Sequence, residues 1–180
     1  MLVGGPLIVV LPLLLLLVMV TCDSSAGDES VVAGVVFTTP FKDNISITIT
    51  SKFGTRIDPI NHTTDFHSGV DLDAPDGSEV VSIGDGEVVQ VALNNGTLGN
   101  TVYIKHSIDG VIYYSVYAHL LNNSIVVSEG QTVKAKQKIG IIGNSGRVTG
   151  THLHLSLMTP ELKWNQKNLI DPVNIITGLK

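Results

Sequence analysis

The chain has 180 residues, a net charge of −5 and an isoelectric point of about 5.6. Its eleven basic residues are scattered rather than clustered, so no nucleic-acid partner is expected. Cys22 is the only cysteine, which excludes an internal disulfide and an all-cysteine zinc site. Any metal site must therefore use His, Asp or Glu. The length suits one domain with a short leader.

Residues 1–26 predict a signal peptide or an N-terminal membrane anchor. The run from Met1 to Cys22 has no charged side chain, and its length matches the roughly 20 residues that span a bilayer. Ser24 and Ala26 supply small residues for cleavage after Ala26, although no Lys or Arg precedes the apolar run. The stretch "MVTC" loosely resembles a bacterial lipoprotein box, so lipidation at Cys22 is an alternative. We expect a secreted or cell-envelope-associated protein.

Residues 27–49 are interpreted as a linker and the first strand region, and residues 50–175 as the main domain. Runs such as "GEVVQVAL", "NTVYIKH" and "VIYYSVYAHL" are rich in β-branched and aromatic residues. The stretches "LNNGTLGN" and "SIDGV" supply turn residues between them. No stretch past residue 30 sustains a convincing amphipathic helix. The pattern predicts an all-β domain, a compact antiparallel sandwich or barrel-like fold.

Two segments of this domain share one pattern, a turn with Gly, a β run and another Gly. They read "PDGSEVVSIGDGEVVQV" and "SEGQTVKAKQKIGIIG", and together they predict a duplicated hybrid motif. Lipoyl and biotinyl carriers also use such half-motifs, with a modified Lys at a hairpin tip. Here the first turn is Asp85-Gly86, and Lys136 and Lys138 lack the flanking Met of those carriers, which disfavours a carrier role.

Five residues in three motifs are candidates for chemistry. "FHSGVDLDAP" contains His67 and Asp71, whose even spacing places both on one face of an extended segment. "SVYAHL" ends a β run with His119. "GTHLHLSL" contains His152 and His154, which project together from a strand while the intervening leucines point the other way. Two buried imidazoles on one strand face need polar partners, so a purely structural role for all five residues is disfavoured.

Zinc chemistry accounts for this set economically. A catalytic zinc site has three protein ligands and an open position for water. His67, Asp71 and one member of the pair His152/His154 supply two nitrogens and one oxygen, and the spacing leaves open which member binds. The remaining histidines then stand beside the metal, where an imidazole can accept a proton or stabilise a developing oxyanion.

The motifs "FHSGVDLDAP", "YAHL" and "SGRVTGTHLHLSL", in this order and spacing, resemble the LytM or lysostaphin-type zinc endopeptidases of peptidase family M23. The resemblance covers residues 50–175 and implies an antiparallel β domain with a substrate groove. It implies one Zn²⁺ per chain bound by His67, Asp71 and His154, with His119 and His152 as the catalytic histidines. It further implies cleavage of peptide bonds in bacterial peptidoglycan, at the cross-link or the cross-bridge. We expect a monomer whose partner is peptidoglycan peptide.

Two alternatives to a working peptidase follow from the same residues. Some members of the family have lost metal ligands and serve as wall-binding modules or activators of other wall hydrolases, but all five site residues are present here. A phosphocarrier domain also pairs two histidines, but it is cytoplasmic and needs no residue like Asp71. The two other histidines are expected outside the site, His106 as a structural residue and His62 in an exposed loop.

Overall fold

The computed structural model describes residues 37–58 and 62–179. The predicted leader or anchor, residues 1–26, and the linker up to residue 36 lie outside the described residues. Among the residues that are described, no helix is long and apolar enough to cross a membrane. The rest of the linker and first strand region, residues 37–49, contributes to the folded domain, because Phe37 and Phe41 are fully buried.

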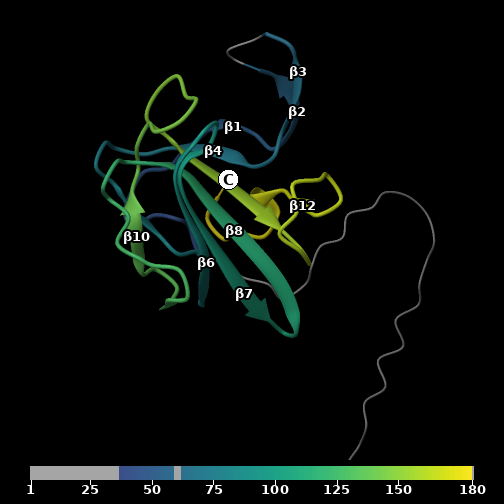
Figure 1. The fold of residues 1–180 in the computed structure, drawn as a ribbon. Helices are drawn as coiled ribbons and strands as arrows, with labels where there is room; N and C mark the ends of the chain where they lie inside the picture. The colour runs from purple at the N-terminus through teal and green to yellow at the C-terminus, as the bar shows by residue number, and fades with distance from the viewer. Residues whose placement is uncertain (1–36, 59–61, 180) are drawn as a thin grey trace, which may run out of the picture. The chain divides into compact units, whose positions relative to one another are not determined.

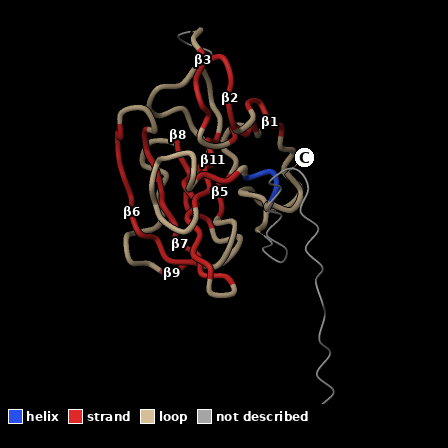
Figure 2. The backbone as a smooth tube through the Cα atoms, turned by 90° about the vertical axis from the view of Figure 1, so that its right-hand side faces the viewer, coloured by secondary structure: helices blue, strands red, loops and turns tan. Residues whose placement is uncertain are grey.

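The described part of the chain is all-β, as the sequence predicted. The main sheet has eight strands in the order β1-β4-β11-β8-β7-β6-β9, with β12 paired to β11 (Figure 1). Two two-stranded sheets, β5–β10 and β2–β3, complete the domain, and Figure 2 draws the strands in red. All these strand pairs are antiparallel. The strands are β1 (Thr48–Ser51), β2 (Gly54–Ile57), β3 (Thr64–His67), β4 (Val70–Asp73), β5 (Glu79–Val81), β6 (Gly86–Asn95), β7 (Gly99–Ile108), β8 (Val111–Leu120), β9 (Thr132–Val133), β10 (Lys138–Ile141), β11 (Leu153–Met158) and β12 (Leu169–Ile170), and a short 3₁₀ helix η1 spans Pro172–Asn174.

The long hairpin of β7 and β8 forms because its turn chemistry and its strands agree. Asp109 and Gly110 both have positive φ, 49° and 80°, which a tight two-residue turn between twisted strands requires. Ile108 and Val111 pair across this turn. The register that begins there continues towards the far end of the hairpin, where His119 lies near the end of β8.

The two repeated segments pair with each other. Strand β5 of the first segment pairs with β10 of the second, and β6 of the first pairs with β9 of the second. Their aliphatic side chains, including Val80, Val88, Val133 and Ile139, belong to the main buried core. The two copies of the predicted motif therefore pack together, and β9 of the second copy pairs with the start of β6 in the first.

The central strand β11 has one face in the core and one face towards the candidate site. Leu153, Leu155 and Leu157 are fully buried in the main core. The alternate residues His154 and Ser156 lie on the opposite face, because successive side chains of a strand point to opposite sides. The predicted alternation of this segment is thus confirmed, and it fixes the side of the sheet on which the chemistry takes place.

Candidate metal centre

His154 lies at the centre of the site because β11 is an inner strand of the main sheet. Its Cα pairs with Asp71 of β4 on one side and with Ala118 of β8 on the other. Asp71 lies between Val70 and Leu72, both fully buried in the core, so its carboxylate emerges on the same face as His154. Strand register alone therefore places the imidazole beside the carboxylate.

His67 reaches the same point because the chain between β3 and β4 passes close to β11. A Cβ atom on Gly69 would lie 2.3 Å from the carbonyl oxygen of Leu155, so no other residue fits there without movement of the backbone. His67, the last residue of β3, therefore lies beside Asp71 of β4 and His154 of β11. The side chains of His67 and Asp71 meet with 3.1 Å between His67 Nε2 and Asp71 Oδ1.

Three acceptor atoms converge in this site, and we call them the acceptor triad: His67 Nε2, Asp71 Oδ1 and His154 Nδ1. The two imidazole nitrogens are 3.0 Å apart, and His154 Nδ1 is 2.9 Å from Asp71 Oδ1. Both rings are buried, with 4% of His67 and 5% of His154 exposed. These three residues form a group whose ligand atoms lie within 4.8 Å of one another. The predicted choice of His154, rather than His152, as the member nearest to the other two atoms agrees with this geometry.

Hydrogen bonds behind the acceptor triad orient its lone pairs. His67 Nδ1 is 2.8 Å from the carbonyl oxygen of Lys52, which only accepts, so a neutral His67 carries its proton on Nδ1 and leaves Nε2 free. His154 Nε2 is 2.8 Å from Ser156 Oγ, which can accept its proton in the same way. Arg56 donates to Asp71 Oδ2 at 3.2 Å, which leaves Oδ1 for the triad. Two imidazole nitrogens and one carboxylate oxygen arranged like this fit a metal ion.

The electrostatics of the triad keep its carboxylate charged and its imidazole neutral. Burial raises the pKa of Asp71, but hydrogen bonds and charge interactions with His154 and His67 in their protonated forms outweigh it and hold the pKa well below its usual range. Burial lowers the pKa of His154, against the opposing effect of Asp71. A negative carboxylate and neutral imidazoles are the protonation states that metal binding requires.

The other two predicted residues stand beside the triad. His119 Nδ1 is 2.9 Å from the carbonyl oxygen of Ser145, and His152 Nδ1 is 2.9 Å from that of Gly150. Carbonyls only accept, so both neutral rings carry the proton on Nδ1 and leave Nε2 as an acceptor. The ring centroids are 4.8 Å apart, and His152 Nε2 is 3.8 Å from Asp71 Oδ1.

Burial lowers the pKa of His119 to about 4, although its hydrogen bond to Ser145 opposes this. The ring of His119 is therefore neutral at pH 7 and can accept a proton through Nε2. The structure brings all five predicted site residues together, and it places the two remaining histidines elsewhere. His62 is exposed, and His106 is fully buried in the core.

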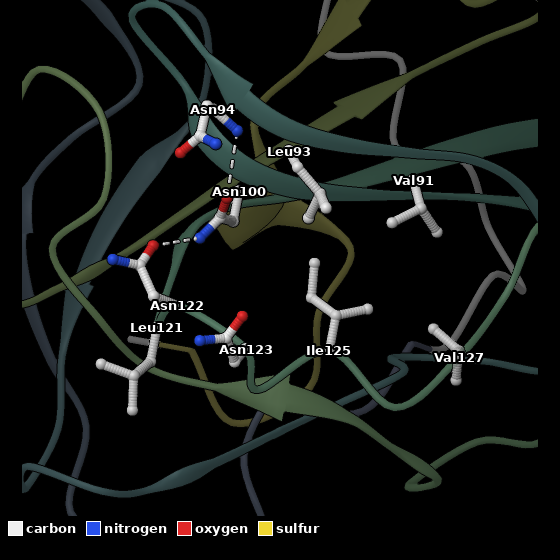
Figure 3. Close-up of a pocket in the computed structure, with 9 residues that line it drawn as sticks. All are labelled: Val91, Leu93, Asn94, Asn100, Leu121, Asn122, Asn123, Ile125 and Val127. Atoms are coloured by element: carbon white, nitrogen blue, oxygen red, sulfur yellow. Dashed lines mark hydrogen bonds between the residues drawn. The ribbon is translucent and has the colours of Figure 1, made fainter.

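A pocket of about 180 Å³ contains these five residues. Two loops also line it: Thr97 and Leu98 precede β7, and Val148 and Thr149 precede β11. A larger pocket of about 590 Å³ is lined only by aliphatic and Asn side chains (Figure 3). Because that larger pocket holds no titratable group, the chemistry belongs to the smaller one.

Sequence reasoning missed the groups that support the site. Ser156 lies two residues after His154 in the same strand, so strand alternation was a usable signal for it. No role was predicted for Arg56. The carbonyl groups of Lys52 and Ser145 carry no sequence signal, because every residue has one. Arg147 forms an ion pair with Asp58 at 3.4 Å between two segments that line the pocket.

A comparison with protein families finds a match to the model described as "Peptidase family M23" over residues 65–172. This range contains all five predicted site residues. Among curated proteins, the peptidoglycan DD-endopeptidase ShyA of Vibrio cholerae is 42% identical over 103 residues, which are 57% of this chain and 23% of ShyA. The chain spans between 23% and 31% of the length of three of the curated relatives that it matches.

Solved structures agree with the family match. A zinc-containing peptidase from Vibrio cholerae is 36% identical with a TM-score of 0.58, over 67% of this chain and 36% of the other. The catalytic domain of the antimicrobial peptidase lysostaphin from Staphylococcus simulans is 30% identical with a TM-score of 0.59, over 72% of this chain and 90% of the other. The likeness to lysostaphin therefore spans nearly the whole of that catalytic domain.

Proposed function

Because this chain belongs to peptidase family M23, we propose that it is a zinc-dependent endopeptidase that hydrolyses peptide bonds in bacterial peptidoglycan. The observation that carries the proposal is the acceptor triad, in which two imidazole nitrogens and one carboxylate oxygen converge within about 3 Å of one another. The name of ShyA as a peptidoglycan DD-endopeptidase supports the substrate class. The zinc content of a related peptidase supports the choice of metal.

In this proposal His67, Asp71 and His154 hold the zinc. Bound zinc supplies a lowered pKa for its water and polarises the carbonyl of the scissile peptide bond. Arg56 keeps the Asp71 carboxylate turned so that Oδ1 faces the two imidazoles. The Lys52 carbonyl and the Ser156 hydroxyl keep the lone pairs of the two imidazoles directed at the same point.

His119 and His152 are the proposed catalytic histidines. Each ring is anchored at Nδ1 by a backbone carbonyl, so its Nε2 is the atom that exchanges protons with the reacting groups. The rings lie side by side, 4.8 Å between centroids. This arrangement suits one ring to accept a proton during attack and the other to stabilise the oxyanion or protonate the leaving amine.

The bond cleaved is proposed to be the cross-link between stem peptides rather than a glycine cross-bridge. The support is the 42% identity over 103 residues to ShyA, which is described as a peptidoglycan DD-endopeptidase. Since peptidoglycan lies outside the cytoplasmic membrane, the proposal places the enzyme outside the cytoplasm. The predicted leader or anchor in residues 1–26 agrees with that location, and the protein is proposed to act as a monomer.

The test follows the release of new amino termini from purified peptidoglycan sacculi by the purified full chain. Release that stops with a chelator and returns when zinc is added is the expected result. Mass spectrometry of the fragments names the bond, and sacculi with and without glycine cross-bridges are the matched substrates. Zinc bound without release from any sacculus would contradict the proposal and favour the wall-binding or activator function instead.

A further inference from the structure

His119 lies on the site face only because β8 contains a bulge. In the regular part of β8, Tyr113 and Tyr117 point into the main core, and by alternation residue 119 points there as well. The pairing shifts at the end of the hairpin: Val102 is opposite Tyr117, but Asn100 is opposite Leu120. Two residues of β8 thus face one residue of β7, which is the arrangement of a β-bulge.

The bulge exchanges the sides of two neighbouring residues. Leu120 is fully buried in the core, and His119 turns to the face that carries His154, with 6.0 Å between the two ring centroids. His119 has a φ of 62°, in the left-handed region. This conformation is unfavourable for a non-glycine residue, so neighbouring groups must hold it.

Backbone groups of two loops hold His119 directly. Its N–H donates to the carbonyl oxygen of Leu98 at 2.9 Å, and its ring Nδ1 donates to the carbonyl oxygen of Ser145 at 2.9 Å. The position of the imidazole therefore depends on where the segments 97–100 and 145–147 lie. These two segments are 45 or more residues apart in the chain, so some contact between them must set their spacing.

The backbone N–H of Arg147 donates to the carbonyl oxygen of Thr97 at 3.0 Å, and Asn100 and Ser145 add a second contact that reaches the bulge itself. The backbone N–H of Asn100 donates to Ser145 Oγ at 2.9 Å, and Ser145 Oγ donates to the carbonyl oxygen of Leu120 at 2.7 Å. Asn100 Nδ2 donates to the same carbonyl at 3.2 Å. The peptide group that follows Leu120, the residue after His119, is therefore held by two side chains, one from each segment.

The side chain of Asn100 is itself fully used and 3% exposed. Figure 3 shows its Oδ1 accepting from the backbone N–H of Asn94 and its Nδ2 reaching Asn122 Oδ1. These distances are 3.1 Å and 2.7 Å. Packing leaves little freedom on the other side, because a Cβ atom on Gly99 would lie 2.4 Å from the carbonyl carbon of Ser145.

We propose that Asn100 and Ser145 are positioning residues that hold the bulge at His119 and so keep its imidazole beside the acceptor triad. The inference rests on the proposed function for its effect on turnover, because a misplaced histidine matters only where it acts on a substrate. Neither residue touches the triad. Their loss is therefore expected to slow turnover while leaving zinc binding intact.

The first test is Ser145→Ala in the full chain loaded with zinc, assayed on soluble cross-linked muropeptides. We expect kcat to fall about 10- to 100-fold, since small displacements of a catalytic group have effects of this size, with KM and zinc content unchanged. Asn100→Asp, which has the same shape but lacks the Nδ2 donor, is expected to give the same split. Ser145→Thr keeps the hydroxyl and is expected to restore kcat.

The matched control is Ser124→Ala. Ser124 is also buried, and its hydroxyl accepts a backbone N–H, that of Ile141 at 3.1 Å, but none of its hydrogen bonds leads to His119. If kcat fell equally in Ser124→Ala and Ser145→Ala, general destabilisation of the fold would explain the loss, and the proposal would be overturned. Unchanged kcat in Ser145→Ala, or a parallel loss of zinc, would also overturn it.

A second measurement does not depend on activity. Long-range ¹⁵N–¹H spectra of the full chain report which ring nitrogen of His119 carries the proton. We expect the Nδ1–H tautomer in the wild type and in Ser124→Ala, and a tautomer mixture in Ser145→Ala. The same tautomer in all three overturns the inference. If the wild type releases nothing from sacculi, the proposed function fails, and this measurement alone decides whether Asn100 and Ser145 position the ring.

Discussion

Two buried histidines, His106 in the core and His154 in the site, have nearly the same surroundings and opposite uses. Each lies on an inner strand of the main sheet, and each has Nε2 at 2.8 Å from a serine hydroxyl, Ser115 for His106 and Ser156 for His154. Burial lowers the pKa of both rings. Neither burial nor the serine partner therefore separates a structural histidine from a candidate ligand.

The difference lies at Nδ1. His106 Nδ1 is 2.8 Å from the backbone carbonyl of Asp85, a neutral acceptor that takes its proton and completes its hydrogen bonds. His154 Nδ1 faces the Asp71 carboxylate and the nitrogen of a second imidazole, His67. A ring with both nitrogens satisfied by neutral groups stabilises the core. A ring whose lone pair meets two more acceptors is prepared for a cation.

The largest expected effect is that of replacing His154, the histidine in the site. His154→Ala removes one atom of the acceptor triad, so zinc content is expected to fall from one per chain to near zero and hydrolysis to fall to background. Metal analysis and the release of amino termini from sacculi measure both. His62→Ala, in the exposed loop, is the control and is expected to keep zinc and activity. A His154→Ala protein that stays loaded with zinc would remove His154 from the ligand set.

A smaller effect is expected beside the triad. His152→Ala is expected to keep most of the zinc but to lower kcat by about 10²- to 10⁴-fold, the usual contribution of a positioned acid or base. The measurement is zinc content together with turnover on the same preparation. If His152→Ala emptied the site while His154→Ala left it loaded, the assignment of the two histidines would be reversed.

His106→Ala tests the structural role of the histidine in the core. This change removes the ring that packs edge-on against Phe37 and leaves the carbonyl of Asp85 without its donor. We expect the free energy of unfolding in urea to fall by about 2–4 kcal/mol, with one zinc per folded chain retained. Loss of zinc from the folded protein would show that His106 supports the site after all.

An effect of similar size is a dependence of stability on pH in the metal-free protein. Burial lowers the pKa of His106, His119 and His154, and that of His119 reaches about 4. Between about pH 6.5 and 4 the unfolded chain therefore binds more protons than the folded one. Stability is complete above pH 6.5 and is lost as the pH falls through this window, on the order of 3 kcal/mol for His119 alone.

Urea unfolding with a chelator at pH 7 and pH 5 measures this dependence. A lower midpoint at pH 5 is expected. His106→Gln, whose amide does not titrate, is expected to show a smaller difference between the two pH values than the wild type. Equal midpoints for the wild type at both pH values would mean that none of these imidazoles has to be neutral in the folded state.

The local sequence was sufficient where a feature depends on near neighbours. The alternation in "THLHLSL" determined that Leu153 and Leu155 enter the core and that His152 and His154 share the other face. Asp109-Gly110 determined the β7–β8 turn, because both positions need positive φ. The three motifs together identified all five residues that the structure brings into one pocket.

Only the tertiary structure decided how those residues are held. His119 belongs to an alternating run that, read alone, sends it into the core. The bulge reverses this, and just after it the carbonyl oxygen of Leu120 accepts hydrogen bonds from Asn100 and Ser145. The tautomer of His67 depends on the carbonyl of Lys52 from another segment. Backbone carbonyls are identical in every residue, and their placement depends on how distant strands pack. No pattern in the sequence reports it.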